Sequence, residues 1–129
     1  SPKRQLSYSM NNALKYCSTY GDGNWYLPTI EEVATLINLK EQLNVTLSKI
    51  SGSQIEETKS NSASYTWDYY SHIISSTESD SDNAKRIRIS DGSVGSVGKN
   101  EAYYYSRSYW QGDYYYYYYH NVVYPVSSL

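Results

Sequence analysis

The sequence predicts a single α+β domain in which two helices pack on short antiparallel strands. Its length of 129 residues fits one domain with a real core and is too short for two ordinary ones. The first third of the chain carries apolar residues at helical spacing. From residue 65 onward, Tyr, Ile, Val, Thr and Trp are interrupted at short intervals by Gly, Asp, Asn and Ser, as in strands and their turns. Two helices followed by several short strands favour the α+β class.

The first helix is expected from Ser9 to about Tyr20. Apolar side chains recur there at helical spacing and form one stripe, made of Met10, Ala13, Leu14, Cys17 and Tyr20. Gly21 stands where a left-handed residue would end the helix. Cys17 is the only cysteine, which excludes an internal disulfide and a multi-cysteine zinc or redox centre, and we expect it to be a small core residue.

A second helix is expected from Ile30 to about Lys40. Thr29 and Glu32 have the spacing of a capping box, and Pro28 keeps the preceding residues out of the helix. The buried face of this helix consists of Val33, Leu36 and Ile37. The next segment, residues 42–64, mixes apolar residues with Ser, Gly and Lys, and we expect one short strand or turn there, followed by a polar loop.

Strands are expected in the rest of the chain. Between residues 84 and 90, charge alternates with isoleucine, which predicts Ile87 and Ile89 in the core and Arg86 and Arg88 in water. The dipeptide at residues 91–92, Asp-Gly, supplies a hairpin turn, and residues 93–98 form the returning strand. Residues 121–126 are expected to form a closing strand, with Pro125 near its end.

The composition narrows the possible functions. A formal net charge of −2 gives no broad electrostatic reason to bind nucleic acid, so no such partner is expected. No apolar run approaches membrane-spanning length, and we expect no direct insertion into a membrane. The chain has 18 tyrosines and no phenylalanine, with six tyrosines in succession at residues 114–119. Because a buried tyrosine needs a hydrogen-bond partner that phenylalanine does not, tyrosine is needed for both its ring and its hydroxyl.

Three phrases of the sequence, in this order, resemble a known family. They are YCSTYGDGNWYLPTIEEVATLIN at residues 16–38, SSTESDSDNAKRIRISDGSV at residues 75–94, and VVYPV at residues 122–126. The chain is similar to the bacterial C-type-lectin-like domain that ends Legionella-collagen-like and related surface proteins, and the resemblance implies that fold. The chain has Tyr26 and Tyr124 where the family usually has arginine, and Ile74 where it has tryptophan. We therefore expect phenolic hydroxyls to take over polar contacts in that region.

The calcium-binding phrases and the disulfides of animal C-type lectins are absent, so the resemblance implies no metal site and no cofactor. Some domains of this family are the variable proteins of diversity-generating retroelements, whose codons are randomised near the C-terminal end. Residues 101–121 (EAYYYSRSYWQGDYYYYYYHN) consist almost wholly of the residue types that such mutagenesis produces, and they directly precede VVYPV. The resemblance thus implies one domain, residues 1–129, with a variable binding region at residues 101–121.

The candidate ligand-binding residues are aromatic side chains of this region. In a strand, three of the six consecutive rings point to each face, so Tyr115, Tyr117 and Tyr119 are either packed inward or exposed. The exposed set is expected to bind a ligand, because tyrosine offers a large contact area with little side-chain entropy to lose. The set chosen is Tyr103, Tyr105, Tyr109, Trp110, Tyr114, Tyr116, Tyr118 and His120. Pairing of an uncharged tyrosine strand with another chain is a third alternative.

Two other patterns, an acidic stretch and a pair of histidines, have both a functional and a purely structural interpretation. The acidic stretch at residues 78–83 could bind calcium through alternate oxygens, but the glycine and closing glutamate of an EF-hand are missing, which favours a solvated loop. His72 and His120 are the only histidines, and no nucleophile elbow or phosphate loop accompanies them. We therefore expect no catalytic residue. A histidine and a carboxylate converging on one pocket would be the first sign of an enzyme.

Together these observations predict an adhesin or receptor-binding module, displayed outside the cell on a bacterial surface or a phage virion. Its expected partner is a cell-surface protein or glycan, and the module can be attached to a larger fibre, pilus or surface protein. The alternative is a structural tip or assembly module, whose tyrosines pack against a neighbouring subunit of a pilus or fibre.

Overall fold

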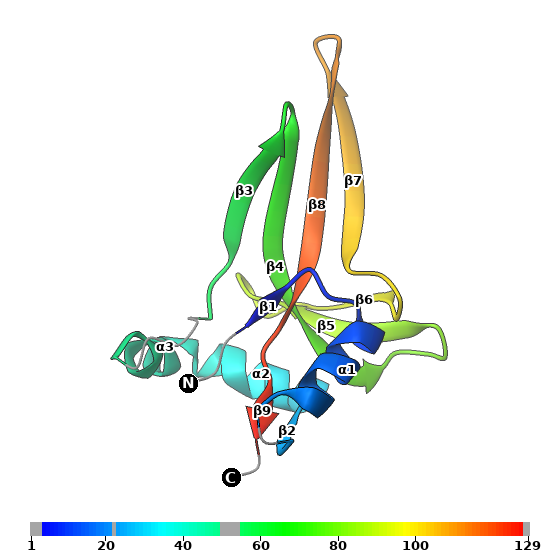
Figure 1. The fold of residues 1–129 in the computed structure, drawn as a ribbon. Helices are drawn as coiled ribbons and strands as arrows, with labels where there is room; N and C mark the ends of the chain where they lie inside the picture. Colours follow the sequence, from blue (N-terminus) through cyan, green and yellow to red (C-terminus); the bar gives the residue numbers. More distant parts are fainter. Residues whose placement is uncertain (1–3, 22, 50–54, 128–129) are drawn as a thin grey trace.

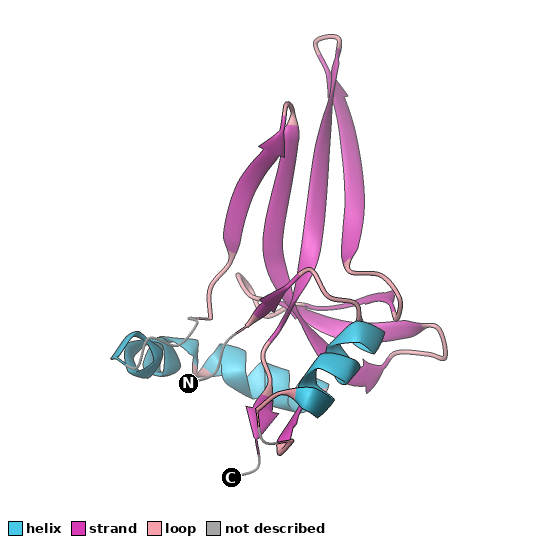
Figure 2. Cartoon of the chain, in the orientation of Figure 1, coloured by secondary structure: helices cyan, strands magenta, loops and turns pink. Residues whose placement is uncertain are grey.

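The computed structural model describes residues 4–21, 23–49 and 55–127 of the chain. These residues form a mixed α+β structure with three helices and a large sheet of seven strands, shown as a ribbon in Figure 1 and by secondary structure in Figure 2. In chain order the elements are β1 (Gln5–Leu6), α1 (Met10–Thr19), β2 (Trp25–Tyr26), α2 (Ile30–Asn38), α3 (Lys40–Lys49), β3 (Thr58–Ala63), β4 (Thr66–Glu78), β5 (Asn83–Arg88), β6 (Val94–Gly98), β7 (Tyr103–Trp110), β8 (Asp113–Val123) and β9 (Val126–Ser127).

Two long strands, β4 and β8, run through the whole molecule side by side. They pair in parallel from Thr66 opposite Tyr116 to Ile73 opposite Val122, so the expectation of short antiparallel strands is wrong for this central pair. The strand β3 pairs with the outer side of β4, and β7 with the outer side of β8, both antiparallel. The sheet continues from β4 to β5 and β6, and β1 adds to the end of β8.

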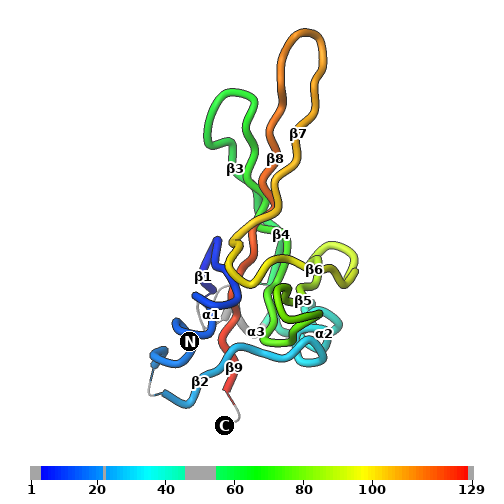
Figure 3. The backbone as a smooth tube through the Cα atoms, turned by 90° about the vertical axis from the view of Figure 1, so that its right-hand side faces the viewer, coloured from blue at the N-terminus to red at the C-terminus, as the bar shows by residue number. Residues whose placement is uncertain are grey.

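The molecule divides into a base and a blade. The base contains the helices, β1, β2, β5, β6, β9 and the ends of β4 and β8. The blade consists of residues 58–70 and 103–120, which form the hairpins β3–β4 and β7–β8. Figures 1 and 3 show both hairpins projecting from the base in the same direction, away from the helices.

In the base, the sheet is covered on both sides. On one side it packs against α2, in a cluster formed by Ile30, Val33, Ile37, Ile55, Ile73, Ile87, Ile89, Val122 and Tyr124. On the other side it packs against α1, in a cluster formed by Met10, Ala13, Cys17, Leu27, Ile74, Ala84, Val97 and Val123. Neighbouring residues of one strand, such as Ile73 and Ile74, therefore belong to different cores because successive side chains point to opposite faces.

The ends of the first two helices confirm the sequence prediction. The Ser9 side chain accepts a hydrogen bond from the Asn12 amide and caps α1, which ends at Thr19 shortly before Gly21 with its left-handed φ of 59°. Thr29 and Glu32 make both bonds of a capping box at the start of α2. Val33 and Ile37 are buried as expected, and Leu36 packs partly buried against the same core.

The prediction for residues 42–64 is wrong. A third helix, α3, follows α2 directly from Lys40 to Lys49, and the strand β3 occupies Thr58–Ala63; residues 50–54 lie outside the described part. The helix lacks a strong apolar stripe, and the strand has no alternation because five of its six residues are exposed. The Asn44 side chain joins this segment to the core by accepting a bond from the Ile55 amide and donating one to its carbonyl oxygen.

The prediction that Arg86 faces water is also wrong. Its guanidinium is buried, and Nη1 donates to Oδ1 of Asn121 at 2.7 Å and to the carbonyl oxygen of Tyr119 at 3.2 Å. Burial lowers the pKa of Arg86 to about 10. The alternation of isoleucine with arginine in β5 suggested that one face of the strand is exposed to solvent. In the base, however, both faces of β5 are covered. Ile87 and Ile89 are buried and Arg88 is exposed, as expected.

Of the remaining local predictions, the place of Leu14 in the apolar stripe of the first helix is wrong, because this side chain is 40% exposed. The others agree with the structure. Gly92 adopts a φ of 73° in the turn between β5 and β6, which pair as a hairpin. Cys17 is 1% exposed, and burial raises the pKa of its thiol to about 11. The closing strand is divided: its first residues end β8, and Val126 begins β9, which pairs with β2 opposite Tyr26.

Candidate functional site: the aromatic blade

In the described part of the chain, no helix covers either face of the blade (Figures 1 and 2). The register of β4, β8 and β7 assigns each aromatic side chain to one of the two faces. We call one the ladder face; its rings are those of Trp67, Tyr69, Tyr104, Trp110, Tyr115, Tyr117 and Tyr119. We call the other the open face; its rings are those of Tyr70, Tyr103, Tyr105, Tyr109, Tyr114, Tyr116 and Tyr118.

On the ladder face, rings from β4 and β8 stack across the junction of the two hairpins. The Trp67 ring lies between Tyr115 and Tyr117, with centroids 6.2 and 6.0 Å away and interplanar angles of 19° in both cases. Tyr69 stacks in the same way on Tyr117 and Tyr119, the latter at 5.3 Å and 15°. The rings cover one another's faces, so this row of side chains holds the two hairpins together.

On the open face, four tyrosines of β7 and the tip of β8 are well exposed. Tyr103 and Tyr105 are each 42% exposed, Tyr114 is 46% exposed and Tyr109 is 63% exposed. Tyr105 contacts the rings of β8, and Tyr109 contacts Tyr114 at 4.9 Å. The Arg107 guanidinium lies 4.6 Å from the centre of the Tyr114 ring, in a cation–π contact.

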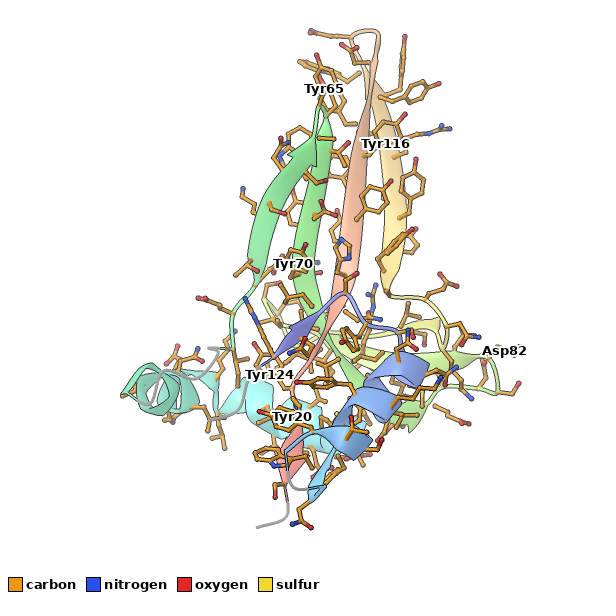
Figure 4. The ribbon with its side chains drawn as sticks, viewed as in Figure 1. Tyr20, Tyr65, Tyr70, Asp82, Tyr116 and Tyr124 are labelled. Carbon is orange, nitrogen blue, oxygen red and sulfur yellow. The ribbon has the colours of Figure 1, made fainter. Side chains whose placement is uncertain are left out.

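The structure gathers six of the eight predicted binding residues on the open face: Tyr103, Tyr105, Tyr109, Tyr114, Tyr116 and Tyr118. Figure 4 shows Tyr116 on the blade, well away from the helices that surround Tyr20 and Tyr124. The Trp110 ring lies on the ladder face near the tip, where Ser108, Tyr109, Tyr115 and Tyr117 line a shallow hollow with it. His120 is 8% exposed and lies at the foot of the blade.

The His120 ring joins three parts of the chain. Its Nδ1 lies 2.8 Å from Oγ of Ser7, and its Nε2 lies 2.6 Å from Oδ1 of Asp68. The ring also stacks on Tyr70, with centroids 4.8 Å apart. Burial alone would raise the pKa of the Asp68 carboxyl, but hydrogen bonds from Ser62 and His120 outweigh it and leave that pKa below its usual value.

This group contains the residue types of a Ser-His-Asp hydrolase. A reacting serine of that kind needs backbone N–H groups free to stabilise an oxyanion. Here the amides of Ser7 and Tyr8 both donate to the carbonyl oxygen of Asn121, at 2.8 and 3.3 Å. The arrangement therefore fastens the N-terminal segment to the blade, and these two amides are engaged with Asn121.

The other candidate sites have local structural partners. Burial, reinforced by the charges of Arg86 and Arg88, lowers the pKa of His72 to about 3, so this half-buried ring stays neutral at pH 7. In the acidic loop, Asp80 accepts hydrogen bonds from the amides of Asp82 and Asn83 and thereby closes the turn. Among the described residues, no three His, Cys, Asp or Glu side chains are grouped closely enough to hold a metal ion.

Sequence reasoning missed the contribution of β4 to this surface. Tyr65, Trp67, Tyr69 and Tyr70 lie far from residues 101–121 in sequence, yet Trp67 and Tyr69 supply the β4 rings of the ladder. Figure 4 shows Tyr65 at the end of the β3–β4 hairpin, where its ring meets Tyr115 at 5.1 Å. The dense aromatic stretch at residues 65–70 was the signal that could have indicated this.

The three phrases that carry the family resemblance meet in the base. The Pro28 carbonyl oxygen accepts from the Ser76 amide at 2.8 Å, and the Ile30 amide donates to Oγ1 of Thr77 at 2.9 Å. The strands β2 and β9 join the first phrase to the last. The Tyr26 hydroxyl donates to Oε2 of Glu32 at 2.6 Å.

Comparison of the chain with protein-family models, with curated proteins and with solved structures gives no match. None of the helices in the described ranges is long and apolar enough to cross a membrane.

Proposed function

We propose that this chain is a ligand-binding module, an adhesin or receptor-binding protein without enzymatic activity. It would grip its target with the tyrosine-rich blade while the base serves as the scaffold. One observation carries the proposal: the blade displays aromatic side chains to solvent on both faces, with Tyr104, Tyr109 and Trp110 about 60% exposed. Exposed aromatic surface of this extent is typical of interaction sites.

The physical case for binding is that the surface is rigid before the target arrives. The stacked ladder face fixes the rings of β4 and β8, and the hairpins hold their backbones in a ladder of hydrogen bonds. Little side-chain entropy remains to be lost on association, and each hydroxyl can donate or accept. Tyrosine and tryptophan are the residues that dominate binding energy at protein interfaces.

The expected target is a macromolecular surface, either a cell-surface protein or a glycan. The hollow near the tip is shallow and lined by side chains of β7 and β8, which suits a broad contact better than an enclosed small molecule. Arg107 is the only charged residue of β7, so affinity would come from apolar burial and hydroxyl bonds. We expect binding to change little between low and physiological salt.

The resemblance to retroelement-diversified C-type-lectin-like proteins supports the same function. Residues 101–121 include β7, the turn and nearly all of β8, so most substitutions there would alter the blade; Asn121, which is buried and accepts from Arg86 of β5, belongs to the base. We propose that this is a variable region on a C-type-lectin-like scaffold at a bacterial cell surface or on a phage virion. The neighbouring DNA tests it: the proposal requires a reverse transcriptase gene and a near-copy of the segment that encodes residues 101–126.

The binding proposal itself is tested with labelled protein on intact bacterial cells, including cells treated with protease or with periodate. A variant with Tyr105, Tyr109 and Tyr114 changed to alanine should lose at least tenfold in affinity while its thermal midpoint holds. Tyr26→Ala is the matched control, because this tyrosine is 39% exposed but lies in the base. Protease sensitivity would identify a protein target, and periodate sensitivity a glycan. Unchanged binding by the triple variant would show that the open face is not the contact surface.

A structural tip or assembly module of a fibre or pilus is the second candidate function. The observation that favours it is the free edge of β7, which could extend the sheet into a neighbouring subunit. Open-ended polymers whose length increases with protein concentration would support this role. A closed small oligomer or a monomer would not.

A further inference from the structure

The two edges of the blade differ. The strand β3 is six residues long, carries Lys59 and is interrupted by a bulge between Asn61 and Ala63. Charge, shortness and bulges are the devices by which proteins protect sheet edges from pairing. The strand β7 pairs regularly with β8 over all eight of its residues, is rich in aromatic residues and is largely exposed. Within the described residues, nothing pairs with its outer side.

The direction of the backbone groups along β7 follows from one hydrogen bond. The Asn121 amide donates to the Ala102 carbonyl oxygen at 2.9 Å, so even-numbered residues of β7 direct their N–H and C=O groups toward β8. The turn at Gln111 and Gly112, with φ values of 49° and 87°, is a two-residue hairpin loop that keeps this alternation to the tip. The odd-numbered residues therefore present their backbone groups outward: Tyr103, Tyr105, Arg107 and Tyr109.

These four residues match a second copy of the same strand. In an antiparallel pair related by a twofold axis at Ser106, Tyr103 stands opposite the partner's Tyr109, and Tyr105 opposite the partner's Arg107. All four outward backbone groups of both copies are then paired. Shifting the axis to Arg107 would place the two guanidinium groups against each other, which like-charge repulsion disfavours.

The side chains are complementary in this register. Arg107 meets the ring of the partner's Tyr105, a cation–π pair. On the ladder face, Tyr104 lies opposite the partner's small Ser108. The partner's Trp110 reaches the level of Ala102, where Asn100, Glu101, Ala102 and Tyr103 line a hollow at the foot of β7. Large side chains thus face small ones or a hollow.

We propose that this protein forms a closed dimer in which β7 pairs antiparallel with β7 of a second copy, in a register centred on Ser106. The pairing joins two blades into one continuous sheet and leaves both aromatic faces in water. The two bases lie at opposite ends, so each dimer carries two open faces. The inference rests on the β7 edge alone and stands whether or not the open face binds a ligand.

Disulfide cross-linking tests the register directly. The pair formed by Ser106 and the partner's Ser106 is a non-hydrogen-bonded pair, with Cα atoms about 4.5 Å apart, within the range that a disulfide spans. Ser108 is separated from the partner's Ser108 by four residues along the strand, about 13 Å, which no disulfide spans. Ser106→Cys should therefore give a covalent dimer under mild oxidation, and Ser108→Cys should stay monomeric on a non-reducing gel. The native Cys17 is buried and does not interfere.

Sedimentation equilibrium across a concentration series supplies the second measurement. Arg107→Pro removes an outward N–H and should raise the dimer dissociation constant at least tenfold. Lys59→Pro is the matched control, since it removes one positive charge and one outward N–H from the other edge, and it should dimerise like the wild type. Circular dichroism confirms that each variant is folded, and if Arg107→Pro does not fold, the cysteine pair decides.

Three outcomes overturn the proposal: a wild-type protein that stays monomeric at all concentrations, equal cross-linking of both cysteine variants, or assemblies that grow beyond the dimer. The binding test is separate. Loss of dimerisation in Arg107→Pro would confirm the edge whatever its effect on cell binding, because the Arg107 side chain also contacts Tyr114 on the open face. Because Tyr105 and Tyr109 also face the partner strand in this register, cell binding of the alanine variant is compared with that of the wild type at a concentration at which both are monomeric.

Discussion

The base and the blade are built from the same two strands but stabilised in different ways. In the base, β4 and β8 carry aliphatic residues such as Ile73, Ile74 and Val122, and helices cover both faces. In the blade, the same strands carry Trp67, Tyr69 and a run of tyrosines, and no helix of the described chain covers them. The sheet therefore changes its means of stabilisation where it leaves the helices.

The difference shows why this chain uses tyrosine and no phenylalanine. An aliphatic side chain gains stability by burial, so it needs a second layer of structure above it. A row of aromatic rings can cover its own faces by stacking across strands, and the phenolic hydroxyl keeps its bond with water. Tyrosine thus permits a single-layer sheet to stand in solvent while it presents a surface able to bind.

The largest expected effect lies in the base. Ile74 is fully buried between β5 and α1, and Ile74→Ala should lower the free energy of unfolding by about 2 to 5 kcal/mol, through lost burial and the cavity left behind. Urea denaturation measures the change. An effect as small as that of an exposed residue would contradict the description of the base as a tightly packed two-sided core.

The next largest effect concerns the buried Arg86. Asn121→Ala removes the acceptor of its guanidinium and should cost about 1.5 to 3 kcal/mol, because the charge remains buried without that partner. The double variant with Arg86→Met and Asn121→Leu should lose less than the single variant, since both partners are then apolar. Equal losses in the two proteins would indicate that the hydrogen bond contributes little.

In the blade, the ladder should contribute a moderate amount. Trp67→Ala removes the ring that bridges Tyr115 and Tyr117 and should cost about 1 to 2 kcal/mol. Trp67→Phe keeps a stacked ring and serves as the control, with a smaller loss. If alanine and phenylalanine are equivalent in denaturant unfolding, stacking does not join the two hairpins.

Protonation of His72 gives a pH-dependent effect that grows as the pH falls. The unfolded chain takes up this proton near pH 6.5, whereas the folded protein resists it down to about pH 3, so the free energy of unfolding should fall as the pH is lowered below 6.5. Thermal midpoints between pH 6.5 and 4.5 should fall less in His72→Gln than in the wild type. Parallel curves would show that the folded His72 accepts the proton freely.

The smallest effect on stability is expected on the open face. Tyr109→Ala or Tyr114→Ala should change the free energy of unfolding by no more than about 0.5 kcal/mol, because these rings lie near the tip, 63% and 46% exposed. Thermal melts of the single variants measure it. A loss comparable with that of Trp67→Ala would mean that the open face is a structural element of the blade.

The base was more predictable from the sequence than the blade. Capping residues such as Ser9 and Thr29 and the periodic Val33 and Ile37 act locally, so they indicated two helices correctly. The strand β3 could not be recognised, because a strand exposed to solvent on both faces has no alternation of apolar and polar residues. The prediction that Arg86 faces water failed for the opposite reason, because both faces of its strand are covered by other parts of the base.

Only part of the candidate binding surface was predicted from the sequence. Composition indicated the tyrosines of β7 and β8. It could not indicate whether the odd- or the even-numbered residues of each strand are the exposed ones, because both faces of the blade are in solvent. The ladder partners Trp67 and Tyr69 come from a parallel pairing between distant segments, and no local pattern encodes the neighbour of a strand. His120 was predicted to bind the ligand with the tyrosines, but its ring is 8% exposed and is held by Ser7, Asp68 and the Tyr70 ring.

Hydroxyl-radical footprinting with peptide mass mapping tests the central claim most directly, at a protein concentration low enough to keep the chain monomeric. Tyr109 and Trp110, 63% and 61% exposed, should be oxidised many times faster than Tyr124 in the base, which is 6% exposed. Comparable protection of all three residues would show that another part of the molecule covers the blade, and would contradict the account of an uncovered aromatic sheet.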